Sequence, residues 1–186
     1  MATRLIALLR GINVGRSKRV PMAQLRELLA ELGYLQVATY LQSGNAIFSC
    51  TAAAAKTAVP DIEQAIAARV GVECKVIVRT AGELAGAMAA DPLREVATDP
   101  ARHLVGFLAG EPAPAGAAAL AALKVAPDRI ALIGRHVYLW CPQGVIASPL
   151  AKLPWERELQ VAVTLRNWNT VSKLAAMTAD AAPTIG

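Results

Sequence analysis

Residues 4–10, Arg-Leu-Ile-Ala-Leu-Leu-Arg, are an apolar run without polar alternation and are too short for a helix of ordinary length. Such a run predicts a β-strand whose sheet is covered on both faces. The segment 103–108, His-Leu-Val-Gly-Phe-Leu, is nearly as apolar and opens a second series of elements. These two strands indicate the plan of the chain, because each begins one half of it.

The first half is expected to contain six elements in the order strand, helix, strand, strand, helix, strand. Pro21 suits the first turn of a helix, where its missing N–H costs nothing, and Gly33 offers a left-handed stop. Ser43-Gly44 has the composition of a tight hairpin turn. The expected elements are a strand at 4–10, a helix from Pro21 to Gly33, strands at 35–42 and 45–49, a helix from Pro60 to Gly71 and a strand at 72–79.

The same order recurs in the second half, and both halves finish alike. Residues 76–80, Val-Ile-Val-Arg-Thr, and residues 163–167, Val-Thr-Leu-Arg-Asn, each lead into a helical pattern. After a helix at 81–90 the expected elements are strands at 103–108, 129–133, 136–141 and 161–165, helices at 113–123 and within 147–159, and a terminal helix. We therefore predict an α+β protein of two tandem ferredoxin-like (βαββαβ) units with mainly antiparallel sheets.

The expected domains are an N-terminal unit at 1–80, a helix and connection at 81–100, and a C-terminal unit with a terminal helix at 101–186. Hydrophobic residues make up 55% of the 186-residue chain, enough for a packed interior. No apolar run is long enough to cross a bilayer, and the first residues lack a signal-peptide pattern. Three widely spaced cysteines do not suggest a disulfide framework. We expect a cytoplasmic protein that does not contact membranes.

Several common chemistries find no support in the sequence. The two histidines, His103 and His136, lie in strand-like runs without partners at metal-ligand spacing, so no metal site is expected. Neither a G-x-S-x-G nucleophile elbow nor a G-x-G-x-x-G dinucleotide motif occurs. No catalytic residue can be named, no cofactor is expected, and whether the chain is an enzyme stays open.

The net charge of +5 belongs entirely to the first half of the chain. Residues 1–80 hold ten Lys and Arg against five Asp and Glu, whereas residues 81–186 hold nine of each kind. A basic patch attracts a phosphate, a carboxylate or a nucleic-acid backbone. The simpler interpretation is a solubilising surface.

The loop at 10–19, Arg-Gly-Ile-Asn-Val-Gly-Arg-Ser-Lys-Arg, follows the first strand and precedes a helix start, where free N–H groups favour anions. In a βαββαβ unit the first two strands are parallel, so the hairpin at 43–45 is expected beside this loop. The expected ligand-binding residues here are Arg10, Gly11, Asn13, Gly15, Arg16, Lys18, Arg19, Ser43, Gly44 and Asn45. Alternatively, the glycines only shape a turn that Asn13 caps.

A second cluster of hydrogen-bonding side chains lies near the C-terminus. It consists of Arg166, Asn167, Trp168 and Asn169, which are also included among the expected ligand-binding residues. Two interpretations stay open. The cluster either joins the binding site or is structural, with Asn169 or Thr170 as the N-cap of a helix and Trp168 as a core anchor.

Three blocks of the chain resemble the uncharacterised bacterial family named "domain of unknown function 1697". They are residues 10–15 with Val20-Pro21-Met22, residues 40–45 and residues 166–171. The resemblance implies tandem ferredoxin-like subdomains, and it brings no activity, cofactor or catalytic residue. One departure is Arg16, where a second glycine after Gly15 is expected.

We therefore expect the protein to bind a small anionic ligand, bearing phosphate or carboxylate, at the edge of the N-terminal sheet. The alternatives are an enzyme acting on such a ligand and nucleic-acid binding through the basic N-terminal unit. RNA recognition on a sheet needs exposed aromatic residues, and these make up only 4% of the chain. The chain is expected to be a monomer or a homodimer.

Overall fold

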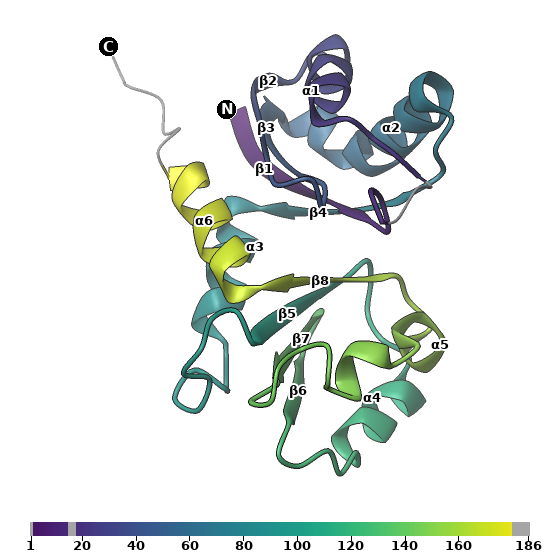
Figure 1. Ribbon diagram of the computed structural model, residues 1–186. Coiled ribbons are helices and arrows are strands. Elements are labelled where there is room, and N and C mark those ends of the chain that lie inside the picture. Colours follow the sequence, from purple (N-terminus) through teal and green to yellow (C-terminus); the bar gives the residue numbers. More distant parts are fainter. Residues whose placement is uncertain (1, 15–17, 180–186) are drawn as a thin grey trace. The chain divides into compact units, whose positions relative to one another are not determined.

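The computed structural model describes residues 2–14 and 18–179, and in these ranges it has an α+β architecture with two four-stranded antiparallel sheets and six α-helices (Figure 1). In chain order the elements are β1 (Ala2–Arg10), α1 (Met22–Glu31), β2 (Leu35–Tyr40), β3 (Asn45–Thr51), α2 (Ala52–Val70), β4 (Lys75–Thr80), α3 (Ala81–Ala89), β5 (His103–Leu108), α4 (Pro114–Ala121), β6 (Arg129–Ile133), β7 (His136–Trp140), the 3-10 turn η1 (Leu150–Lys152), α5 (Trp155–Leu159), β8 (Val163–Asn167) and α6 (Trp168–Ala179).

The first sheet has the strand order β2-β3-β1-β4, and every neighbouring pair is antiparallel. Since β1 and β2 both run opposite to β3, they are parallel to each other and end at the same rim of the sheet. Helices α1 and α2 cover one face (Figure 1). The core on that side includes Leu5, Ala7, Leu9, Leu25, Leu29, Phe48, Ile62 and Ile66.

The residues of β1 that alternate with this core are buried as well. Ile6 and Leu8 are 0% and 1% exposed. The sequence prediction that the apolar first strand has both faces covered is confirmed. The all-apolar run 5–9 follows from this burial, because a strand with one wet face alternates apolar and polar residues.

Helix α2 begins eight residues earlier than predicted. The sequence suggested Pro60 as its first turn, but the helix starts at Ala52 and Pro60 lies inside it. Thr51 provides the start, because its side-chain hydroxyl accepts a hydrogen bond of 3.2 Å from the Ala54 N–H. The alanines at 52–55 are strong helix formers and outweigh the cost of the internal proline. The predicted stop at Gly71 is confirmed, with φ of 70°.

The second sheet repeats the plan of the first, with the order β6-β7-β5-β8 and only antiparallel pairs. Helices α4 and α5 lie against one face of it (Figure 1). Its core includes Leu104, Leu108, Leu120, Val137, Leu139, Trp155, Leu159 and Val163. A Cβ atom at Gly116 of α4 would lie 2.0 Å from the Glu158 carbonyl oxygen of α5, so only glycine allows these two helices to pack this closely.

Strands β4 and β8 each lead directly into a helix, α3 and α6, and the two junctions share the same hydrogen bonds. Arg79 and Arg166 are both buried, and each guanidinium donates a hydrogen bond to the carbonyl of the preceding residue. Thr80 and Asn167 then act as N-caps, accepting from the N–H groups of Glu83 and Thr170 at 3.0 Å and 2.9 Å. The repeat suggested by the matching sequences is therefore present in the structure.

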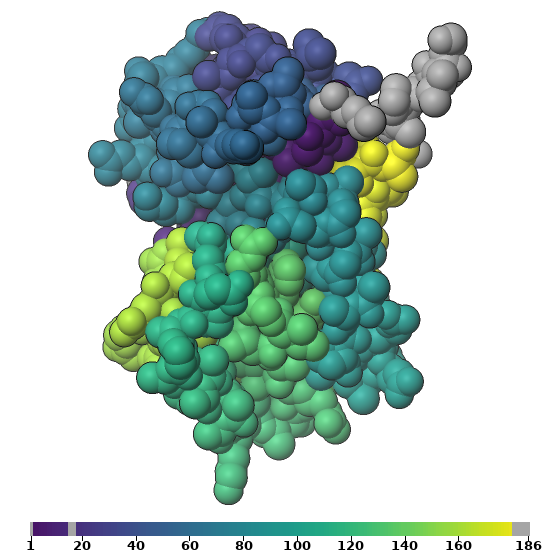
Figure 2. Space-filling model, turned by 180° about the vertical axis from the view of Figure 1, so that it is seen from behind, coloured from purple at the N-terminus to yellow at the C-terminus, as the bar shows by residue number. Residues whose placement is uncertain are grey.

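The chain forms two compact units, Met1–Ala85 with Leu174–Gly186, and Gly86–Lys173. In Figure 2 the yellow residues at the end of α6 lie beside the purple residues of β1, in keeping with this division. Helix α3 is thus shared between the units at Ala85, within the stretch 81–100 that the sequence suggested as a connection. Across residues 2–14 and 18–179, no helix is long and apolar enough to cross a membrane.

Candidate functional site

The loop after β1 and the hairpin between β2 and β3 meet at one rim of the first sheet. The Leu9 N–H donates a hydrogen bond of 2.8 Å to the Gly44 carbonyl, and the Asn13 amide donates one of 2.7 Å to the Gln42 carbonyl. Gly44 has a φ of 82°, and a Cβ atom there would lie 2.8 Å from Leu9 Cβ, so the hairpin needs glycine to lie this close to the end of β1. Since β1 and β2 are parallel, the turns that follow them lie at the same rim of the sheet.

Asn13 acts as a brace for this loop. Its side-chain Nδ2 donates to the Val20 and Gln42 carbonyls at 3.0 Å and 2.7 Å, and its Oδ1 accepts from the Val20 N–H at 2.9 Å. Its own N–H donates to the Lys18 carbonyl at 2.9 Å, which closes the loop. Both Asn13 and Lys18 have positive φ, 55° and 53°, and asparagine tolerates that conformation better than most residues. The Asn13 amide therefore shapes the site from within.

Ser43 and Asn45 differ in exposure. Asn45 is fully buried, and its Nδ2 donates to the Tyr40 carbonyl at 2.7 Å and to Ser43 Oγ at 3.1 Å. Asn45 thus fixes the hairpin from inside, whereas Ser43 is exposed at its tip. Gly15 and Arg16, which the sequence also suggested as ligand-binding residues, lie outside the described residues.

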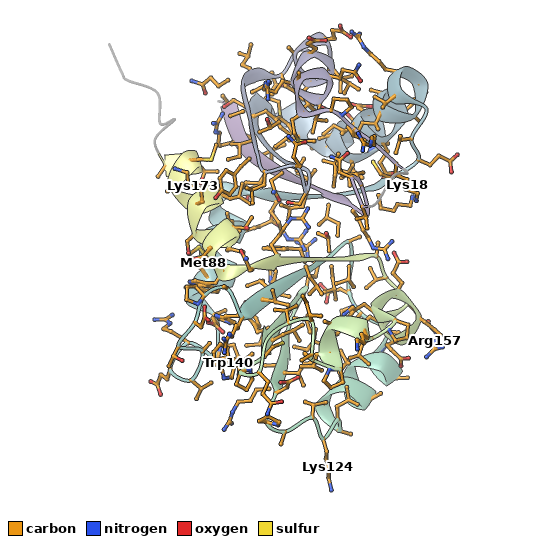
Figure 3. All side chains as sticks on the ribbon, in the orientation of Figure 1. Lys18, Met88, Lys124, Trp140, Arg157 and Lys173 are labelled. Atoms are coloured by element: carbon orange, nitrogen blue, oxygen red, sulfur yellow. The ribbon has the colours of Figure 1, made fainter. Side chains whose placement is uncertain are left out.

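A cavity of about 530 Å³ opens where β1 ends, β4 begins and α2 passes by. Its volume lies within the range typical of small-molecule sites. It is lined by Arg10, Gly11, Lys18, Glu63, Gln64, Ala67, Glu73, Cys74 and Lys75. Arg10 and Lys75 face each other directly in the β1–β4 register, and Lys18 is labelled on the loop after β1 in Figure 3.

The charges around this cavity are partly paired. Lys75 Nζ lies 3.4 Å from Glu63 Oε2, and the other oxygen of Glu63 accepts from the Val76 N–H at 2.9 Å. In contrast, neither Lys18 nor Glu73 has a hydrogen-bond or ion-pair partner for its side chain among residues 2–14 and 18–179. Three cations and two carboxylates leave the cavity lining with one net positive charge, which favours an anionic group on a ligand.

Cys74 is half-buried in the wall of the cavity. Burial and, to a lesser extent, the Glu63 carboxylate raise the pKa of its thiol to about 11, while Lys18 and Lys75 act in the opposite direction. The thiol is therefore protonated at neutral pH and is a poor nucleophile. The Glu63 carboxylate is held by Lys75 and by the Val76 N–H.

Arg19 lies at a different hollow from Arg10 and Lys18. Together with Asn13, Pro21 and Gln42 it lines a second space of about 350 Å³. Residues that the sequence suggested as one site therefore line two spaces, with Arg10, Gly11 and Lys18 at the first and Asn13 and Arg19 at the second.

The cluster at 166–169 belongs to the second unit and is largely occupied by structural contacts. The buried Arg166 donates to Thr164 Oγ1 at 2.8 Å, and burial lowers its pKa to about 10. Asn167 caps α6, so the expectation of a cap at Asn169 or Thr170 was wrong by two or three positions. Trp168 stacks on His103 at a ring distance of 4.7 Å, and Asn169 is exposed.

His103 and Asp91 form a buried pair beside this stack. His103 Nε2 lies 3.5 Å from Asp91 Oδ2, and the two side chains are 3% and 0% exposed. The second oxygen of Asp91 accepts from the Leu93 N–H at 2.9 Å. Burial lowers the pKa of His103, although the Asp91 carboxylate opposes this effect. Among the described residues, no group of three or more His, Cys, Asp or Glu side chains is placed to hold a metal ion.

With the fold and the cavity described, comparison with known proteins identifies the family. The model of the family "Protein of unknown function (DUF1697)" matches residues 2–138 of this chain. The chain belongs to this family. The DUF1697 match includes the loop after β1, the β2–β3 hairpin and every residue that lines the 530 Å³ cavity, whereas the block at 166–171 lies beyond it.

A solved structure shares the fold of this DUF1697 protein. It is described as a conserved bacterial protein from Streptococcus pneumoniae, is 24% identical in sequence, and has a TM-score of 0.77 over 96% of this chain and 99% of that one. No match is found among curated proteins.

Six cavity residues of the DUF1697 protein were missed by sequence reasoning: Glu63, Gln64, Ala67, Glu73, Cys74 and Lys75. The signal for Lys75 was present, because the fourth strand of a βαββαβ unit pairs antiparallel with the first and so begins where the first ends. Glu63 and Gln64 had no such signal, since their place beside the loop depends on how α2 crosses the sheet.

Proposed function

We propose that this protein binds a small ligand through an anionic group, phosphate or carboxylate, in the cavity at the rim of the first sheet. The observation that carries the proposal is the convergence of Arg10, Lys18 and Lys75 from three separate segments on one space of ligand size. Arginine and lysine in such a concave site attract anions more strongly than they do on an open surface.

The internal repeat of the chain supports a functional role for the loop. In the second unit five residues, 109–113, connect the first strand to its helix, whereas in the first unit eleven residues, 11–21, make the same connection. Both strands are anchored to their hairpins alike, since the Leu108 N–H donates to the Arg135 carbonyl at 3.1 Å. A connection of five residues thus suffices for the fold, and longer loops frequently carry function.

Thermal unfolding with phosphorylated and carboxylated metabolites tests the proposal. A ligand at about one hundred times its Kd stabilises by about 2.7 kcal/mol, which raises the melting temperature of a chain of this size by about 5–10 °C. The double variant Arg10→Ala, Lys18→Ala should lose this shift. The control variant Lys56→Ala, Lys124→Ala removes the same charge from exposed sites outside the cavity and should keep it. A shift equal in both variants would contradict the proposal.

Cys74 offers a second readout that does not depend on stability. It lines the cavity, whereas Cys50 and Cys141 are buried. Because the pKa of Cys74 is raised to about 11, its alkylation by maleimide at pH 8 should be slow, and a bound ligand should slow it further, as measured over hours by mass spectrometry of the labelled peptide. An unchanged rate with a ligand that shifts the melting temperature would mean that the ligand binds elsewhere.

We also propose that both units are ferredoxin-like and that the protein is cytoplasmic. The strand orders β2-β3-β1-β4 and β6-β7-β5-β8, with helices on one face of each sheet, support the first point. The free thiols of all three cysteines support the second, because disulfides are rare in a reducing compartment.

A further inference from the structure

We propose that the ligand is bipolar, with an anionic group at one end and a protonated amine at the other, and that Glu73 binds the amine. The inference rests on the proposed function of the cavity. It is motivated by one feature: the side chains of Lys18 and Glu73 carry opposite charges, line the same cavity, and have no hydrogen-bond or ion-pair partner among the described residues.

The separation of these two charges follows from the local structure. Lys18 is held by the hydrogen bond from the Asn13 N–H to its carbonyl, in a closed loop with left-handed backbone. Glu73 comes two residues after Gly71, which ends α2, and two residues before β4 begins. The backbone at Lys18 is thus anchored by the Asn13 brace, and the backbone at Glu73 lies between a helix end and a strand start.

The same cavity also contains one ion pair, between Lys75 and Glu63. Lys75 and Glu63 lie 3.4 Å apart, so opposite charges in this space join where the backbone allows it. The two separated charges leave one position for an anion, near Lys18 and Arg10, and one for a cation, near Glu73. The lining of the same cavity also includes the small or neutral residues Gly11, Gln64 and Ala67, and its volume of about 530 Å³ leaves room for the body of a short ligand.

Two pairs of probes test this inference, each differing only in the amine. O-phosphoethanolamine is compared with ethyl phosphate, and β-alanine with propionate, by isothermal titration calorimetry. In at least one pair the amine-bearing probe should bind the wild-type protein about fivefold more tightly, which is the upper range for a solvent-accessible ion pair. The pair that shows the preference also tells whether the anion is phosphate or carboxylate.

Glu73→Gln should abolish the preference for the amine, and it should keep or slightly raise the affinity for ethyl phosphate or propionate, because the cavity loses a negative charge. The matched control is Glu95→Gln, which removes one charge from an exposed position outside the cavity and should keep the preference. Equal affinities within both pairs on the wild-type protein would overturn the bipolar ligand and leave the anion site standing. A preference that persists in Glu73→Gln would also overturn it. Absence of binding by all four probes would count against the anion site itself.

Discussion

The side chain of Asn13 joins its own loop to the backbone at Val20 and at Gln42. Its replacement should therefore lower both the stability of the protein and its affinity for a ligand. In Asn13→Ala the Val20 N–H and the Val20 and Gln42 carbonyls lose their partner. We expect a loss of about 1–3 kcal/mol in the free energy of unfolding, measured in urea. The exposed Asn169→Ala is the matched control and should change it by less than about 0.5 kcal/mol. If Asn13→Ala lowered the free energy of unfolding by less than about 0.5 kcal/mol, Asn13 would not stabilise the loop as described.

His103 should make the stability of the protein depend on pH. Burial lowers its folded-state pKa below the ordinary 6.5, so the unfolded chain takes up the proton more readily. The contribution of His103 is therefore complete above about pH 6.5 and is lost as the pH falls below that value. Urea unfolding between pH 7 and 5 should show a steeper loss for the wild type than for His103→Phe, which keeps a ring against Trp168.

His136→Phe is the control for this experiment, because it removes the other histidine of the chain. It should retain the wild-type pH dependence. If His103→Phe showed the same slope as the wild type, the buried pair with Asp91 would not be responsible.

Residues of the candidate site were only partly foreseeable from the sequence. Arg10, Gly11 and Lys18 were selected from their place between a strand and a helix, and they do line the cavity. Asn13 and Asn45 were selected as ligand contacts for their amides, and the structure shows these amides donating hydrogen bonds to carbonyls of the loop and the hairpin. Composition indicates that such a side chain forms hydrogen bonds, whereas the choice of partner depends on how the two turns meet in space.

At the level of elements, the contact between α4 and α5 should tolerate no side chain at Gly116. A Cβ atom there meets the Glu158 carbonyl at 2.0 Å, and backbone cannot yield as a flexible side chain would. Gly116→Ala should cost about 1–3 kcal/mol or more in urea unfolding. Gly86→Ala is the matched change within α3, where nothing lies within 4 Å, and it should stabilise by about 0.5–1 kcal/mol. Equal effects would contradict the packing argument.

Helices and strands can be predicted from the sequence where a local signal exists. An apolar run predicts β1, Gly71 predicts the end of α2, and Gly44 predicts the hairpin. The start of α2 was mistaken because two signals compete: proline favours a first turn, and Thr51 followed by alanines favours an earlier one. The hydrogen bond from Ala54 to Thr51 shows which of them prevails.

For the molecule as a whole, each unit should have the same ranking of strand stability. β1 and β5 are paired on both sides, whereas β2 and β6 are edge strands. Amide hydrogen exchange followed by mass spectrometry should therefore be slowest in β1 and β5 and clearly faster in β2 and β6. Equal protection of β1 and β2, or of β5 and β6, would be inconsistent with this strand order.

The sequence predicts units at 1–80 and 101–186 joined by a connection, from the repeat alone. Matching segments at 76–80 and 163–167 indicate the repeat, and the structure groups the end of α6, from Leu174 to Ala179, with the first unit. Such an assignment depends on packing between residues far apart in the chain, for which a single sequence has no local pattern.

In each unit a backbone hydrogen bond joins the end of the first strand to the hairpin, from Leu9 to Gly44 in one and from Leu108 to Arg135 in the other. This arrangement affects which parts of the chain can vary in sequence and length. Since this hydrogen bond forms in both units although the connections that follow the strands differ in length, the length of that connection can change while the strand stays joined to its hairpin. Replacing residues 109–113 with a longer segment would then be a way to give the second unit a loop of its own.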